Sequence, residues 1–239
     1  MNTTMKAART AGFLYLIYIV ISIFADGLGR SKLIVLGDAT TTAKNIMASA
    51  WQFRIGFVTD LAAAVLFLLT AWALYALLKP VNKNLALLFL LLNLGGVAVW
   101  CSSDLFLIAS QLLLSSGDYL KVFQADQLQA LAMASLYVYK YGFDGIAQLF
   151  FGAWLFPLGY LVFKSGFLPK VLGVILMVHC VVWSMSALQF FFFPGFIGLT
   201  FAGITYVSYP LGFISEFGLT LWLLIKGAKE QKPALVEVA

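Results

Sequence analysis

Seven ionisable side chains lie inside long apolar runs of this sequence, where they could bind a charged solute. A charge at the centre of a bilayer costs about 2.5–3.5 kcal/mol on insertion scales, so it normally faces a protein interior or water. An excess of carboxylates in such a place favours a cation, an amine or a proton-coupled solute. The candidate ligand-binding residues are Arg54, Asp60, Asp104, Lys140, Asp144, His179 and Glu216.

Helical spacing places these candidates on faces that carry other polar side chains. At about 100° per residue, residues three and four positions apart share one face of a helix. Three such stripes are Asn93, Gly96, Trp100, Asp104 and Gln111; Tyr137, Lys140, Tyr141, Asp144 and Gln148; and Thr205, Tyr209, Gly212, Glu216 and Thr220. Most of the charges fall in the outer half of the spans. We therefore predict a polar, hydrated cavity that opens outward and ends near Glu216.

Helix packing is the alternative role for the same residues. Lys140 and Asp144 are four positions apart and could neutralise each other within one helix. Polar side chains also bind membrane helices together, at about 0.6 kcal/mol per contact. For His179 alone, a structural hydrogen bond is the expected role.

Cofactor, metal and nucleic-acid chemistry has little support in the sequence. One histidine and two cysteines, Cys101 and Cys180, are too few for a typical haem, zinc or iron–sulfur site. Both cysteines lie in apolar runs and are predicted to be small buried side chains without a disulfide bond. The phosphate-loop, His-Glu-x-x-His and Gly-x-Ser-x-Gly motifs are missing. The net charge of +5 is small, so we predict no cofactor, no metal and no nucleic-acid partner.

The composition predicts the elements that must position these residues. The chain is 62% hydrophobic and 10% charged, whereas an average soluble domain is about 25% charged. A span needs roughly 20 apolar residues, and lipid-exposed backbone must be helical. We expect an all-α bundle, a single transmembrane domain over residues 1–239 that contacts membrane lipids. Its six spans are predicted at about 10–29, 52–78, 84–114, 136–163, 169–193 and 203–225.

The basic residues in the connections predict the orientation of the bundle. Nine lie on one side: Lys6, Arg9, Lys79, Lys83, Lys164, Lys170, Lys226, Lys229 and Lys232. Four lie on the other: Arg30, Lys32, Lys44 and Lys121. The positive-inside rule therefore places both termini in the cytoplasm. Asp38 and Asp126 resemble helix N-caps, so the outer loops are expected to contain short interfacial helices.

Several segments together resemble a bacterial membrane family designated domain of unknown function 4386. They are Lys6–Tyr15, Ser31–Thr40, Phe53–Arg54, Leu78–Asn84, Ser116–Leu120, Leu158–Ser165, Leu168–Gly173 and Glu216–Gly227. The resemblance implies a polytopic protein of the bacterial plasma membrane and supplies no activity. Asn93 stands where many members carry arginine, and Trp154 where many carry histidine, which lowers the expectation of catalysis.

Three functions from different classes remain open, in this order. The first is binding or transport of a small cationic or proton-coupled solute through the predicted cavity. The second is a structural or assembly subunit whose polar stripes only hold helices together. The third is an intramembrane lipid-modifying enzyme with Asp104, Glu216 or His179 as acid–base groups, which must approach a reacting atom to about 3 Å.

Overall fold

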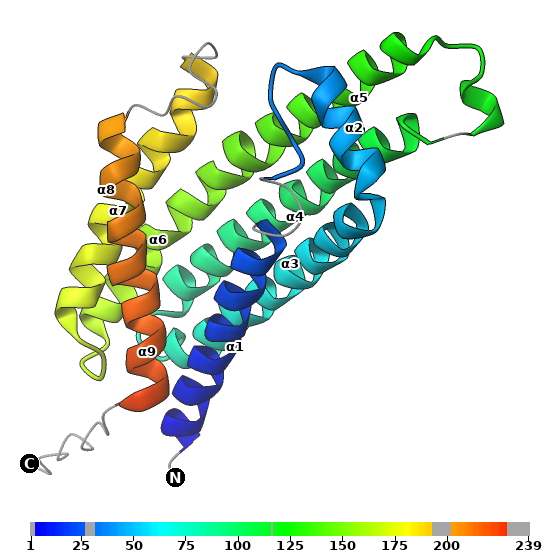
Figure 1. Ribbon diagram of the computed structural model, residues 1–239. Helices are drawn as coiled ribbons and strands as arrows, with labels where there is room; N and C mark the ends of the chain where they lie inside the picture. Colours follow the sequence, from blue (N-terminus) through cyan, green and yellow to red (C-terminus); the bar gives the residue numbers. More distant parts are fainter. Residues whose placement is uncertain (1–2, 27–31, 116, 193–201, 229–239) are drawn as a thin grey trace, which may run out of the picture.

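The protein is a bundle of long helices packed side by side (Figure 1). The computed structural model describes residues 3–26, 32–115, 117–192 and 202–228, and these contain helices and turns but no strand. Six helices in this part of the chain are long and apolar enough to cross a membrane. The predicted all-α fold with six spanning helices is therefore confirmed. Which side of the membrane each end faces stays a prediction.

The helices follow the apolar runs closely. The first three spans are α1 (Thr3–Ala25), α3 (Ala50–Leu78) and α4 (Lys83–Leu113). The fourth is built from α5 (Ala125–Lys140), the π-helical segment η3 (Tyr141–Ala147) and α6 (Gln148–Lys164). The fifth is α7 (Lys170–Phe192), and the sixth is α8 (Ala202–Gly212), the π-helical segment η5 (Phe213–Phe217) and α9 (Gly218–Ile225).

Two expectations about the outer loops have different outcomes. The short helix α2 (Ala39–Ala48) begins where predicted, because Asp38 accepts hydrogen bonds from the Thr41 amide and hydroxyl at 2.8 and 2.7 Å. The segment after Asp126 is not a separate short helix, since α5 begins at Ala125 and continues into the fourth span. That span therefore extends beyond the predicted 136–163. A one-turn helix η2 (Asp118–Leu120) lies in the preceding loop.

The ends of the helices are fixed by local capping. Asn82 accepts a hydrogen bond from the Leu85 amide at 3.0 Å, which starts α4 directly after the turn that follows α3. Gly227 has a φ of 65°, the left-handed conformation that typically ends a helix, and its amide reaches back to the Trp222 carbonyl. A Cβ at Gly227 would overlap Met5, so the beginning of α1 and the end of α9 lie together.

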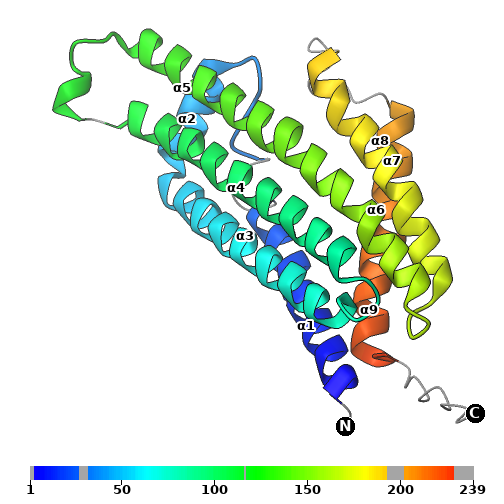
Figure 2. The same ribbon diagram turned by 180° about the vertical axis from the view of Figure 1, so that it is seen from behind.

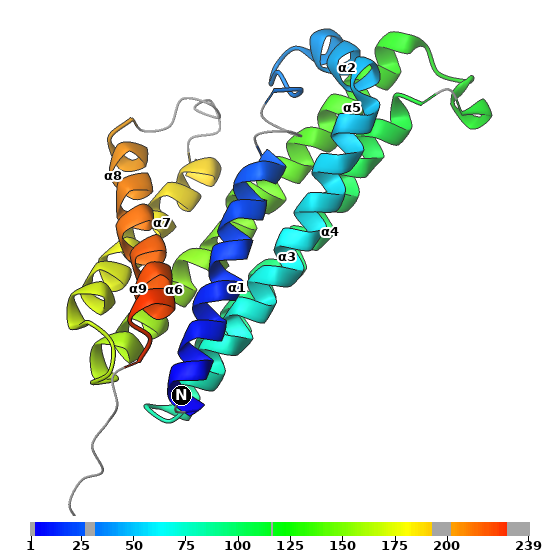
Figure 3. The same cartoon turned by 60° about the horizontal axis from the view of Figure 1, so that its bottom comes forward.

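The helix order leaves the beginning of α1 and the end of α9 at one end of the bundle, seen from two sides in Figures 1 and 2. Close packing joins α6 to α7, where Gly159 and Gly173 approach each other's backbone so closely that a Cβ on either would clash. At the opposite end, α2 lies across the outer part of α5 (Figure 3), with the Thr40 hydroxyl donating to Gln129 at 3.1 Å. The main core runs through all six spans and is rich in aromatic side chains.

Candidate functional site

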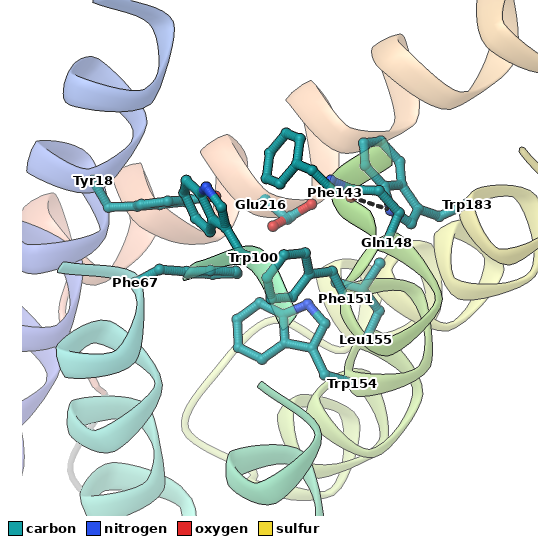
Figure 4. A pocket seen from close by; sticks show the side chains of 10 residues that line it. All are labelled: Tyr18, Phe67, Trp100, Phe143, Gln148, Phe151, Trp154, Leu155, Trp183 and Glu216. Atoms are coloured by element: carbon teal, nitrogen blue, oxygen red, sulfur yellow. Dashed lines mark hydrogen bonds between the residues drawn. The ribbon is translucent and has the colours of Figure 1, made fainter. Parts of the chain in front are cut away.

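A central cavity of about 220 Å³ lies between the spanning helices (Figure 4). Side chains from all six spans line it, and several stand near the midpoints of their helices. The lining residues are Tyr18, Phe67, Trp100, Phe143, Gln148, Phe151, Trp154, Leu155, Trp183 and Glu216. Seven of these ten carry aromatic rings, so the cavity is far less polar than the sequence analysis predicted.

The rings of the central cavity form a continuous wall rather than isolated contacts. Phe67 contacts Phe151 and Trp154 edge-on, with ring centroids 5.1 and 5.0 Å apart. Tyr18 stacks on Phe67 at 4.2 Å, and Trp100 lies 6.2 Å from Phe151. Edge-to-face and offset contacts of this kind hold aromatic pairs in fixed orientations. The wall therefore presents a preformed aromatic surface to whatever occupies the cavity.

Glu216 is the carboxylate of the central cavity, and it lies among the rings in Figure 4. It belongs to the π-helical segment η5, and its side chain is 25% exposed. The buried Tyr15 hydroxyl of α1 donates to one carboxylate oxygen, and His179 Nδ1 of α7 lies 3.6 Å from the other. In the described part of the chain, no lysine or arginine pairs with Glu216. Among the described residues its side chain is therefore held by the Tyr15 hydroxyl and the His179 ring alone.

Ser215, His179 and Glu216 resemble a catalytic triad in composition but not in geometry. The Ser215 hydroxyl lies 3.2 Å from His179 Nδ1, and Glu216 approaches the same nitrogen. In a triad the nucleophile and the acid use different ring nitrogens, so that one orients the base and the other is activated. His179 is fully buried, and its Nε2 has no hydrogen-bond partner among the described residues. The arrangement therefore does not favour nucleophilic catalysis.

Asp60 acts on the central cavity through Trp100. The Trp100 indole N–H donates to Asp60 Oδ2 at 3.3 Å, and both side chains are buried. This bond joins α3 to α4 and fixes the Trp100 ring that lines the cavity. Asp60 thus positions the Trp100 ring and places a carboxyl group behind the aromatic wall.

The other candidates lie apart from Glu216. Lys140 and Asp144 pair with each other at 2.7 Å, and each side chain is 28% exposed. Arg54 is exposed near the start of α3, whereas Asp104 is buried on α4, one turn beyond Trp100. Of the seven candidates, the structure gathers Glu216 and His179 directly and adds Asp60 through Trp100.

The π-helical segment η3 lies where one predicted stripe and the observed site differ. A π-helical turn accommodates more residues than an α-helical turn, so it rotates the face of everything that follows it. Gln148 follows η3 and lines the cavity, where its side-chain oxygen accepts from the Trp183 indole at 3.1 Å. Asp144, on the same predicted stripe, pairs with Lys140 instead. The close approach of Gly142 to Ser103 on α4 accompanies this irregular segment.

Helical spacing placed Trp100 on a polar stripe but missed the phenylalanines of the lining, whose signal in the sequence is weak. The chain has 22 phenylalanines, and the sequence does not distinguish those that face lipid from those that face the cavity. Asn93 and Trp154, the two positions that the sequence analysis singled out from the resemblance, are both buried. Both polar atoms of the Asn93 side chain lack a hydrogen-bond partner among the described residues, and the Trp154 ring lines the cavity.

Metal ligation and disulfide formation find no support in the described residues. No group of three His, Cys, Asp or Glu side chains there could hold a metal ion. Cys101 and Cys180 are both free thiols, partly buried in different helices.

Comparison with known proteins identifies relatives without a known activity. Residues 10–227 match the family described as Domain of unknown function (DUF4386). An uncharacterized protein of Archaeoglobus fulgidus is 27% identical over 165 residues, which cover 69% of this chain and 79% of that protein. No solved structure matches the chain.

Proposed function

This chain belongs to the family defined by the domain of unknown function DUF4386, and we propose that it binds a small organic cation in the central cavity. The observation that carries the proposal is the combination of seven aromatic rings with one carboxylate in a single cavity. A cation over an aromatic face gains about 2 kcal/mol or more where water is excluded. Glu216 supplies the opposite charge, which offsets the free-energy cost of removing a cation from water.

The surroundings of Glu216 also favour a cation over an anion or a neutral solute. Its recorded polar partners are Tyr15, a hydroxyl donor, and His179. Asp60 adds a second carboxylate behind Trp100. Among the lining residues there is no lysine or arginine that could hold an anionic ligand.

Transport of that cation is an extension supported by the helix irregularities at the cavity. The segments η3 and η5 contribute Phe143 and Glu216 to the lining, and Pro210 lies inside α8, one turn before η5. Transporters commonly form their sites at the membrane midplane from interrupted helices. Uptake of labelled tetramethylammonium into proteoliposomes tests this extension. Binding without uptake would contradict transport.

The membrane in which the protein works is expected to be the cell membrane, with both termini in the cytoplasm. The nine-to-four excess of basic residues supports this orientation. A structural or assembly subunit is the alternative function, and it requires no ligand in the cavity.

Calorimetric titration of the purified protein with tetramethylammonium tests the proposal. Saturable binding is expected for the wild type, and at least about tenfold weaker binding for Glu216→Gln, which keeps the shape but removes the charge. Asp126→Asn, an exposed carboxylate at the start of α5, is the matched control and should bind normally. Equal binding by Glu216→Gln, or none by the wild type, would contradict the proposal.

A further inference from the structure

The central cavity offers few hydrogen-bond acceptors to a bound cation. Of its ten lining residues, only Tyr18, Gln148 and Glu216 have a side-chain oxygen. The Gln148 oxygen already accepts from the Trp183 indole, and Glu216 already accepts from Tyr15. Most carbonyls of the surrounding backbone are bonded within their own helices. The remaining capacity lies with the Glu216 carboxylate and the Tyr18 hydroxyl.

This distribution discriminates between kinds of ammonium group. A primary ammonium has three N–H donors, is compact and is strongly hydrated. Inside the cavity its acceptors would be Glu216 and the Tyr18 hydroxyl, and any remaining donor would face aromatic rings. An unsatisfied buried donor is costly. Methylation of the nitrogen removes the donors and keeps the charge.

The aromatic wall suits the surface that methylation creates. Phe67 contacts Phe151 and Trp154, with ring centroids 5.1 and 5.0 Å apart, and Trp100 continues the wall at 6.2 Å from Phe151. Methyl groups on a cationic nitrogen carry part of its charge and pack on ring faces, which is how aromatic cages recognise quaternary ammonium ligands. Leu155 adds aliphatic surface to the same lining.

The volume of the cavity admits a small organic cation. About 220 Å³ is many times the roughly 10–15 Å³ that one water needs on the same measure. A trimethylammonium group with a short tail therefore has room inside the cavity.

From the acceptors, the rings and the volume, we infer that the ligands of the central cavity are small quaternary or trimethylated ammonium compounds, in preference to primary amines of the same skeleton. This rests on the proposed function and names the substrate class of that site. Glu216 neutralises the charge, while the ring wall selects for the methylated nitrogen.

The test measures the binding of three related probes to the full chain in detergent. They are choline, its primary-amine counterpart ethanolamine, and 3,3-dimethylbutan-1-ol (dimethylbutanol), the neutral analogue of choline with carbon in place of nitrogen. Choline is expected to bind at least tenfold more tightly than either of the others. Binding of ethanolamine as tight as that of choline would overturn the preference and leave cation binding intact. Dimethylbutanol binding as tightly as choline, or no binding of either cation, would overturn both.

A pair of variants on α6 adds an independent measurement. Phe151→Leu removes a lining ring and keeps an apolar side chain, so choline affinity is expected to fall about fivefold while dimethylbutanol affinity changes little. Phe156→Leu, whose ring is 54% exposed on the same helix, is the matched control and should bind as the wild type does. If Phe151→Leu lowered the affinities for choline and dimethylbutanol equally, the rings would contribute only shape and not attraction to the charge, which would contradict the inference.

Discussion

Tyr15, on the first helix, donates a hydrogen bond to Glu216, 201 positions later in the sequence. The bond joins α1 to η5 beside the central cavity, so the first and last spans share one polar contact in an apolar core. It orients the carboxylate that the proposed cation would meet. The structural role and the binding role of Glu216 are therefore linked through Tyr15.

Tyr15→Phe removes only the hydroxyl and tests whether the hydrogen bond to Glu216 supports both stability and binding. A hydrogen bond to a charged group contributes about 1.5–3 kcal/mol, so the melting temperature is expected to fall by several degrees. Tetramethylammonium binding should weaken as well, because the carboxylate is no longer held. Tyr209→Phe, at a side chain that is 69% exposed, is the control and should change neither quantity. Unchanged melting of Tyr15→Phe would mean that the contact does not stabilise the bundle.

Lys140 and Asp144 are expected to depend on each other. Their ion pair is only partly exposed in a membrane-spanning helix, so removing one partner leaves a charge that the apolar surroundings disfavour. Lys140→Ala and Asp144→Ala should each lower the melting temperature more than the double variant does.

The pair Lys121–Asp118 is a control with the same 2.7 Å contact but side chains that are 76% and 90% exposed. Its single variants should be near neutral, because exposed ion pairs contribute little. Additive, near-neutral effects at Lys140 and Asp144 would show that this pair too behaves as a surface pair.

Much of the fold could be predicted from the sequence because lipid imposes a simple rule. A run of apolar residues such as 52–78 has to be helical, and the helix is found at Ala50–Leu78. The fourth helix starts earlier than its apolar run, at Ala125, because residues 125–135 are only moderately apolar and project beyond the length that a bilayer needs. The pattern of apolar residues predicts where a helix crosses the membrane, but not how far that helix continues into water.

The site was predictable only in part, for two physical reasons. Glu216 stood out because a carboxylate in an apolar run is costly, and it does line the cavity. Phe67 and Phe151 did not stand out, because lipid and an aromatic cavity accept the same residue type. Across the π-helical segment η3, Gln148 lines the cavity whereas Asp144 does not, although α-helical spacing assigned both to one face.

Orientation in the membrane is open to direct labelling. In a background without Cys101 and Cys180, a cysteine at Lys121 is expected to react with an impermeant maleimide in intact cells. A cysteine at Lys83, exposed at the end of the bundle that carries the termini, should react only after permeabilisation. The expectation follows from the excess of basic residues at that end. Labelling of Lys83→Cys alone in intact cells would reverse the orientation.

Asp38 gives α2 a pH-dependent start. Its hydrogen bonds from the Thr41 amide and hydroxyl hold the pKa of its carboxyl below the usual value. The ionised cap is therefore fully effective above the ordinary carboxyl pKa and is lost as pH falls through the lowered folded value. As the pH falls through that value, hydrogen exchange of the Thr41 and Thr42 backbone amides should accelerate relative to the intrinsic exchange rate at the same pH. Asp38→Asn keeps an acceptor and should abolish that extra dependence, whereas Asp38→Ala should fray α2 at neutral pH.

The most direct measurement of cation binding uses a ligand that can be located by its own scattering. Tetramethylarsonium has the shape and charge of tetramethylammonium, and its arsenic gives an anomalous signal in crystals of the protein. One peak is expected inside the central cavity, between the Glu216 carboxylate and the rings of Phe151 and Trp154. An empty cavity at a concentration that saturates the calorimetric titration, with peaks only on the outer surface, would contradict cation binding at this site.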